Sequence, residues 1–229
     1  MIEFIKDYLK VSSSDAALII SPENRFYFTD FASSDGFLLV SADRAAFIID
    51  GRYIEAAQKT VKNCEEMLQS QTISQIKDVL TALGAKSVAV EAERMTLKQY
   101  AELARALDGI DIVCDGELDL EIEKIRSIKN KSQVEKIIKA QRIAEAAFEH
   151  ILTFIKEGVT EKEVALELDY YMLSHCADGL SFETIAVSGK NSSKPHGVPS
   201  DKKIEKGDFV TMDFGAVVEG YHSDMTPKV

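Results

Sequence analysis

The chain has 229 residues, 45% of them hydrophobic, with a formal net charge of −11 at pH 7 and a pI near 4.9. This length predicts one large or two small domains, and the acidic balance argues against nucleic acid or an anionic membrane as a partner, because both bind basic surfaces. Cys64, Cys114 and Cys176 lie far apart with no CxxC pair, which is typical of reduced thiols in a cytoplasmic protein.

The first half of the chain alternates short apolar strands with helices. Its charged start has no long apolar run, so we expect neither a signal peptide nor a membrane span. Helical spacing predicts a helix over 72–83, and Thr96 is the predicted cap of a helix that ends at Leu107. This alternation predicts an α/β domain with a mixed sheet over residues 1–124. The predicted strands are 16–21, 36–40, 45–50, 87–90 and 110–114, with a further helix over 53–60.

A second domain is predicted over residues 125–229. Ser132 and Glu135 predict a capping box at the start of a long helix, and Thr160 and Glu163 predict another at the start of the next helix. The predicted order is a helix that Gly158 ends, a helix to about residue 176, a strand over 182–188, a polar loop over 189–207 and a closing hairpin.

Two carboxylates lie on the predicted hairpin. Asp213 comes at the end of an apolar strand, a tight turn near 218–220 reverses the chain, and Asp224 lies on the return strand. We expect Asp213 and Asp224 to lie directly opposite each other, where Cβ atoms are roughly 5 Å apart and like charges repel. Carboxylates suit divalent cations, so the pair is a candidate metal site. The alternative is a pair of solvated surface aspartates.

His196 is the candidate catalytic histidine. It lies on a loop between Pro195 and Pro199, which restrict the backbone. A neutral imidazole there would donate to a substrate carbonyl or to a developing oxyanion. The alternative is an exposed turn residue. His222 shares the strand face of Asp224 by alternation, and we expect it to face solvent or to support the site indirectly.

Several segments together carry a resemblance to a known family. The second domain resembles the pita-bread metallopeptidases, specifically the Xaa-Pro aminopeptidases (aminopeptidase P) and the Xaa-Pro dipeptidases (prolidases). The first domain looks like the creatinase-type N-terminal domain. The segments in the second domain are 181–185, 188–192, 194–196, 206–215 and 220–226, and those before it are 24–31, 34–36, 50–53 and 128–135.

The resemblance implies a dinuclear metal site. Asp213 and Asp224 match the family's first two metal ligands, and His196 matches the histidine that contacts substrate. The expected metal is manganese, with cobalt or zinc as alternatives, and the expected substrates are proline-containing peptides or dipeptides. In the family, a metal-bound hydroxide attacks the bond between an N-terminal residue and proline. The implied fold is an α/β creatinase-type domain followed by the first half of an α+β pita-bread domain.

This chain also departs from the family pattern in its last residues. The family's further histidine and its two glutamate ligands lie downstream of the hairpin, where this chain has only residues 225–229. We therefore expect a C-terminally truncated chain that is inactive alone and forms homodimers. The alternative is a non-enzymatic oligomerisation or interaction fragment. The resemblance leaves open whether the lineage is an aminopeptidase or a dipeptidase, and it disfavours creatinase, which is metal-free.

Overall fold

The computed structural model describes residues 1–229 and divides them into two compact units, Met1–Ile128 and Lys129–Val229. The division falls four residues after the predicted boundary at 124. Helix α6 (Glu117–Ser127) continues across that boundary, and its Leu118 and Ile122 are buried in the core of the first unit. No helix combines the length and the apolarity needed to cross a membrane.

The first unit is built on a mixed six-stranded sheet with the order β4-β3-β2-β1-β5-β6. Strand β1 pairs antiparallel with β2 and parallel with β5, which confirms the predicted mixed sheet. The strands are β1 (Ala16–Ile19), β2 (Phe37–Ser41), β3 (Ala45–Ile49), β4 (Glu65–Leu68), β5 (Ser87–Val90) and β6 (Asp111–Val113).

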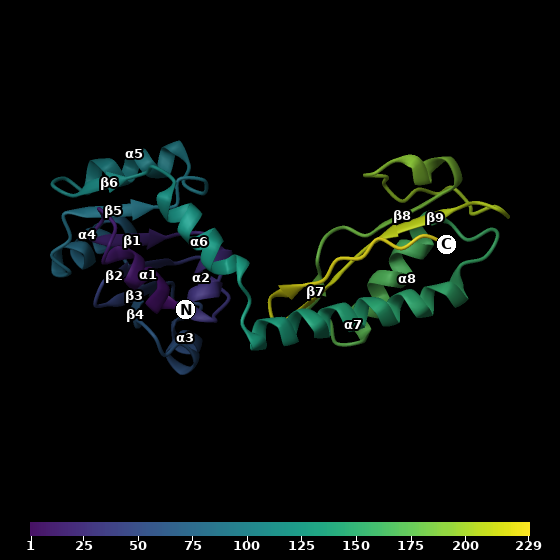
Figure 1. Ribbon diagram of the computed structural model, residues 1–229, viewed down its shortest axis with the longest axis horizontal. Helices are drawn as coiled ribbons and strands as arrows, with labels where there is room; N and C mark the ends of the chain where they lie inside the picture. The colour runs from purple at the N-terminus through teal and green to yellow at the C-terminus, as the bar shows by residue number, and fades with distance from the viewer. The chain divides into compact units, whose positions relative to one another are not determined.

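Helices cover both faces of this sheet, as Figure 1 shows. Because side chains alternate along a strand, Ala17 and Ile19 of β1 join one core while Ala16 and Leu18 join the other. The first core is closed by α1 (Ile2–Leu9), α2 (Pro22–Thr29), α3 (Ile54–Thr60) and α6. The second core is closed by α4 (Thr72–Ala82) and α5 (Leu97–Ala106).

The two long helices of the second unit begin at capping boxes. Helix α7 (Lys131–Phe154) begins two residues earlier than predicted, because the box is formed by Asn130 and Gln133 and not by Ser132 and Glu135. The Asn130 side chain accepts from the Gln133 N–H at 3.0 Å, and the Gln133 side chain accepts in return at 2.8 Å. The predicted box of Thr160 and Glu163 is confirmed at the start of α8 (Glu161–Ser174).

The strands of the second unit lie over α7 and α8 (Figure 1). They form a three-stranded sheet with the order β11-β10-β7 and a two-stranded sheet in which β8 pairs with β9. Val210, Met212 and Phe214 point into the core, as the sequence predicts, while Thr211 and Asp213 face away from it. The elements are β7 (Gly179–Leu180), β8 (Ile185–Ser188), the 3₁₀ helix η1 (Gly189–Ser193), β9 (Val210–Asp213), β10 (Ala216–Val218) and β11 (Tyr221–His222).

Candidate active site

The two predicted metal ligands lie on one face of the hairpin but are not directly opposite each other. Val217 pairs with His222, and Phe214 pairs with Met225. This register sets Asp213 across from Thr226 and Asp224 across from Gly215. The predicted direct opposition is therefore wrong by two residues. The aspartates are diagonal neighbours on the same face, where long side chains still reach each other.

The other two predicted site residues, Asp224 and His196, both act on the pKa of Asp213. Burial raises this pKa most, and the negative charge of Asp224 raises it further. The Thr226 hydroxyl, which donates to Asp213 Oδ1 at 3.1 Å, and His196 both act in the opposite direction. The net effect is a raised pKa, which means that the Asp213 carboxylate is stabilised when it binds a proton or when a cation lies beside it.

Gly215 keeps the two strands close between the aspartates. A Cβ on Gly215 would lie 2.0 Å from the carbonyl oxygen of Ser223 and 2.9 Å from the hydroxyl of Ser181. Ser223 is buried, and its N–H donates to the carbonyl of Ala216 at 2.9 Å. Only glycine permits this approach of two backbones. This close approach brings the segment that carries Asp224 against the strand that carries Asp213.

His196 is exposed on the segment that joins η1 to β9. The next residue, Gly197, is buried against Val187 of β8, and a Cβ at Gly197 would lie only 2.8 Å from a Val187 methyl group. Val187 pairs with Thr211, which shares its strand face with Asp213. The missing side chain at Gly197 therefore lets the loop place His196 near the aspartates.

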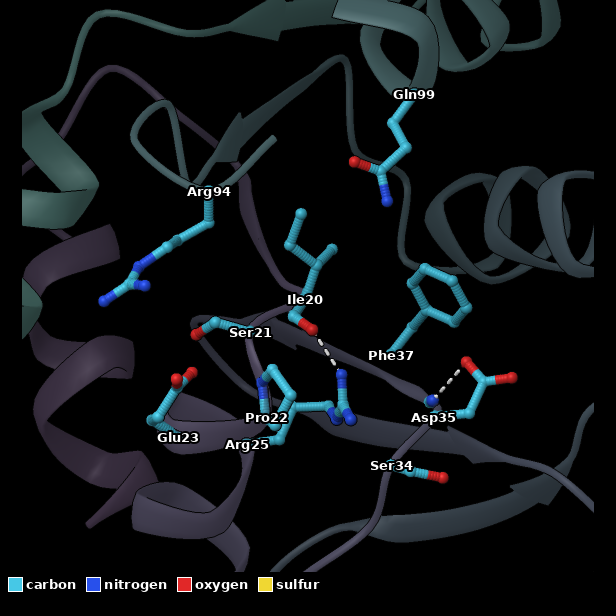
Figure 2. A pocket seen from close by; sticks show the side chains of 11 residues that line it. Ile20, Ser21, Pro22, Glu23, Arg25, Ser34, Asp35, Phe37, Arg94 and Gln99 are labelled. Atoms are coloured by element: carbon cyan, nitrogen blue, oxygen red, sulfur yellow. Dashed lines mark hydrogen bonds between the residues drawn. The ribbon is translucent and has the colours of Figure 1, made fainter. Parts of the chain in front are cut away.

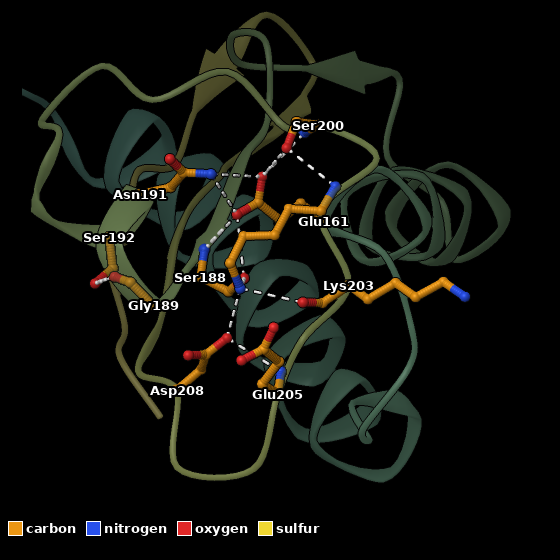
Figure 3. Close-up of polar contacts among 10 residues, drawn as sticks. Glu161, Ser188, Gly189, Asn191, Ser192, Ser200, Lys203, Glu205 and Asp208 are labelled. Carbon is orange, nitrogen blue, oxygen red and sulfur yellow. Dashed lines mark hydrogen bonds and ion pairs between the residues drawn. The ribbon is translucent and has the colours of Figure 1, made fainter.

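A buried carboxylate, Glu161, fixes both ends of this loop (Figure 3). Before His196, Ser188 donates its N–H to Glu161 at 2.7 Å, and the Asn191 amide donates at 3.1 Å. After His196, Ser200 donates its N–H at 3.1 Å and its hydroxyl at 2.6 Å. The Glu161 side chain is 1% exposed. One carboxylate at the first turn of α8 thus anchors the loop on either side of His196.

A lysine completes this polar cluster. Lys202 Nζ donates to the Ser188 hydroxyl at 3.0 Å and pairs with Asp208 at 2.6 Å. The lysine lowers the pKa of Asp208 through this hydrogen bond. Asp208 also lies against Gly189, where a Cβ would be 2.5 Å from its Oδ1. The cluster therefore ties the start of η1 to the segment that leads into β9.

The two carboxylates are ligands of the type that divalent metal ions bind. Asp213 and Asp224 offer carboxylate oxygens, and their mutual repulsion would be relieved by a cation between them. The chain has no group of three or more His, Cys, Asp or Glu side chains arranged to hold a metal ion. His222 is exposed. The sequence predicts that it either faces solvent or supports the site indirectly, and exposure is compatible with both.

The sequence reasoning missed the residues that build the loop. Glu161 follows the cap residue Thr160, where an acidic residue is ordinary, so the sequence does not single it out. One signal in the sequence pointed to such an anchor. Ser188, Asn191 and Ser200 lie on both sides of His196, and polar residues that become buried when the loop folds need a hydrogen-bond partner.

Two family matches divide the chain where the structure does. Residues 1–128 match the creatinase/prolidase N-terminal domain, and residues 135–227 match metallopeptidase family M24. The first match covers the same residues as the compact unit Met1–Ile128, and the second lies within the compact unit Lys129–Val229. They confirm the expected fold, a creatinase-type α/β domain followed by the first part of a pita-bread domain.

Relatives and solved structures agree with these matches. An uncharacterized peptidase of Bacillus subtilis (YqhT) is 43% identical over 216 residues, which cover 94% of this chain and 60% of that protein. The Xaa-Pro dipeptidase from Bacillus anthracis is 37% identical with a TM-score of 0.94, covering 100% of this chain and 63% of that one. The X-Pro aminopeptidase from Thermotoga maritima is 32% identical with a TM-score of 0.87, covering 96% and 63%. The chain thus spans less than two thirds of the length of each of these proteins.

Proposed function

Because the chain belongs to metallopeptidase family M24 and carries a creatinase/prolidase N-terminal domain, we propose that it supplies the first part of an Xaa-Pro peptidase site. The peptidase would hydrolyse the bond between an N-terminal residue and proline. The observation that supports this most is the gathering of Asp213, Asp224 and His196 on one face of the second unit. A dipeptidase and an aminopeptidase are both among the similar structures, so the proposal covers either.

Each of the three residues has a proposed role. Asp213 and Asp224 would hold divalent ions, which when bound supply Lewis acidity at the scissile carbonyl. The Thr226 hydroxyl orients the Asp213 carboxylate by its hydrogen bond to Oδ1. His196 donates a ring N–H to the substrate carbonyl oxygen, where negative charge develops. Glu161 keeps His196 in place by holding Ser188 and Ser200.

Metal, assembly and location extend the proposal. Two carboxylate ligands favour manganese over zinc, because zinc is better suited by imidazole and thiolate ligands.

We also propose a homodimer. Its contact surface would include Leu166, Tyr170 and Leu173, which share a face of α8 and are exposed. The three cysteines are free thiols, which supports a cytoplasmic location. The chain by itself is proposed to be inactive, because two carboxylates do not complete a dinuclear site.

A chimera tests this function directly. The experiment joins this chain, through Thr226, to the part of the Bacillus subtilis relative that the chain does not span. With Mn²⁺, we expect the chimera to cleave an Xaa-Pro dipeptide and the chain alone to show no turnover above background. Asp213→Ala in the chimera is expected to lower kcat/KM by at least about 10³-fold, because it removes a metal ligand.

The His196 role has its own readout in the same chimera. His196→Ala is expected to lower kcat by about 10²–10³-fold, the usual effect of losing one oxyanion donor, with metal content unchanged. Exposed His222 provides the matched control, and His222→Ala is expected to retain activity within about 3-fold. A folded, metal-loaded chimera without Xaa-Pro cleavage would contradict the proposed function. So would turnover that survives Asp213→Ala.

A further inference from the structure

The hairpin of the candidate site closes through a turn of only two residues. Val218 of β10 pairs directly with Tyr221 of β11, so Glu219 and Gly220 alone join the strands. Both have left-handed backbones, with φ of +50° at Glu219 and +77° at Gly220. Two consecutive residues of this kind define a type I′ turn, a common connection in two-residue hairpins.

Glu219 is a poor residue for this turn by its local preference. Left-handed φ is uncommon for residues other than glycine, and the first turn position favours Asn, Asp or Gly. The segment has a second way to reverse the chain. Val218 and Glu219 would form a right-handed type I turn with Gly220 alone left-handed, a three-residue loop that is the next most common hairpin connection. Local preference therefore favours the longer loop, and the structure has the shorter one.

The choice between the two loops decides which face of the hairpin carries Asp224. In the observed register Asp224 lies across from Gly215, on the face of Asp213. The three-residue loop would shift the return strand by one residue and set Asp224 across from Phe214, whose side chain is fully buried in the core. A slip of one residue moves every side chain to the other face. The candidate metal site would then lose one of its two carboxylates.

Contacts from two other elements hold Glu219 in the shorter turn. Its carboxylate forms ion pairs with Lys136 and Lys139 of α7, each at 3.3 Å. Its backbone N–H donates to Asp178 Oδ2 at 2.6 Å. The N–H of Asp178 donates in turn to the carbonyl of Val217 at 2.8 Å. Both the side chain and the backbone of Glu219 are thus fixed relative to β10.

These contacts form a network that the longer loop would break. A single exposed ion pair contributes little to stability, but several charges held together contribute more. The Lys136 side chain is only 17% exposed, and its Nζ lies 5.3 Å from the centre of the Tyr221 ring. Lys136 therefore contacts the residues on both sides of Gly220. The longer loop would turn the Tyr221 ring to the opposite face of β11, away from Lys136.

We propose that Glu219 is a positioning residue for the metal ligands. Its contacts with Lys136, Lys139 and Asp178 select the two-residue turn and thereby keep Asp224 on the face of Asp213. Glu219 acts through the register of the hairpin and contacts neither ligand. This inference rests on the proposed metal-binding role of the two aspartates, but the register itself is measured without metal.

NOE spectroscopy of the metal-free full chain reads the register. Val217 and His222 form a non-hydrogen-bonded pair, because the neighbouring Ser223 N–H donates to Ala216. The backbones of such a pair approach most closely, so their Hα atoms give a strong NOE. We expect this Val217–His222 NOE in the native chain. In Glu219→Ala we expect an Ala216–His222 NOE to replace it, because the return strand moves by one residue.

A rescue variant separates the turn from the ion pairs. Asn-Gly is a preferred sequence for this turn, so Glu219→Asn is expected to keep the native NOE without the lysine contacts. Lys136→Ala combined with Lys139→Ala leaves Glu219 in place and is expected to shift the register as Glu219→Ala does. Arg94→Ala removes an exposed cation at the rim of a pocket in the first unit (Figure 2), and this control is expected to change nothing.

Titration of the same chains with Mn²⁺ connects the register to the metal ligands. Glu219→Ala is expected to bind Mn²⁺ about 10–100-fold more weakly than the native chain, the usual effect of losing a residue that positions a ligand, and Glu219→Asn is expected to bind within about 3-fold of it. A native NOE pattern in folded Glu219→Ala would overturn the proposal, and so would equal weakening of Mn²⁺ binding by Glu219→Ala and Glu219→Asn. A register shift in Glu219→Ala, with no Mn²⁺ binding by the native chain, would support the assigned turn and contradict the metal site.

Discussion

Replacing Glu161 by alanine is expected to cost the second unit about 3 kcal/mol of unfolding free energy, because it leaves several donors around a buried carboxylate without their acceptor. Glu161 is buried and accepts from Ser188, Asn191 and Ser200. Without it, the buried N–H of Ser188 loses its acceptor, and so do the Asn191 amide and the Ser200 hydroxyl. An unsatisfied buried donor costs about 1–3 kcal/mol on its own.

The same residue makes the second unit sensitive to acid. Burial raises the pKa of Glu161, but the hydrogen bonds from Ser200, Ser188 and Asn191 outweigh it, and the net pKa lies below the usual value. A carboxyl whose pKa is lower in the folded state stabilises the fold above its unfolded pKa. This contribution is lost as the pH falls through the folded pKa. Acid should therefore weaken the native chain more steeply than Glu161→Ala.

Hydrogen exchange resolved by mass spectrometry measures these effects where they occur. In Glu161→Ala, amides over 185–200 are expected to exchange at least about 10²-fold faster at pH 7, while amides of the first unit keep their rates. Glu157, exposed in the turn before α8, offers the control, and Glu157→Ala should change exchange free energies by less than about 0.5 kcal/mol. If Glu161→Ala behaves like Glu157→Ala, Glu161 does not anchor the His196 loop.

Gly215→Ala is expected to destabilise the second unit by about 3 kcal/mol and to separate the two aspartates. A Cβ at this position would lie 2.0 Å from Ser223 O, a backbone atom that moves only if the hairpin opens. Overpacking of this kind costs about 1–3 kcal/mol, and more where backbone must shift. Because Asp224 follows Ser223 directly, opening the hairpin also moves Asp224 away from Asp213.

Gly179 provides a matched control in the neighbouring strand. It pairs with Val217 and has nothing within 4 Å of its Cβ position, so Gly179→Ala should leave stability within about 1 kcal/mol of the native chain. Denaturant unfolding followed by circular dichroism compares the two variants, since the chain has no tryptophan. Equal midpoints for Gly215→Ala and Gly179→Ala would contradict the close approach at Gly215.

The sequence predicts strands and caps well where local signals agree with tertiary packing. The strand over 87–90, the cap at Thr96 and the box at Thr160 lie where they were expected, because β-branched runs and side-chain caps are local features. Helix α2 was not predicted. Its aromatic run over 26–28 favours a strand by propensity, but the Ser21 cap, Pro22 and burial of Phe28 in the core select a helix.

The candidate site was predicted in part. The carboxylates and His196 were predicted as candidate site residues because chemistry-bearing residues in apolar or restricted surroundings are visible in a sequence. Their geometry was not, because the turn falls at Glu219 and Gly220 and sets a register with Thr226, not Asp224, across from Asp213. A register depends on where a turn closes, and a shift of two residues preserves the face while changing every partner.

The central claim is that Asp213 and Asp224 bind a divalent metal ion beside His196. Titration of the full chain with Mn²⁺, followed by paramagnetic broadening of its NMR signals, tests it most directly. We expect broadening centred on residues 213–215, 224–226 and the His196 ring, lost in Asp213→Asn and kept in Asp201→Asn, at an exposed ion pair with Lys162. Broadening no stronger at Asp213 than at Asp201, or unchanged by Asp213→Asn, would show that the aspartate pair is not a metal site.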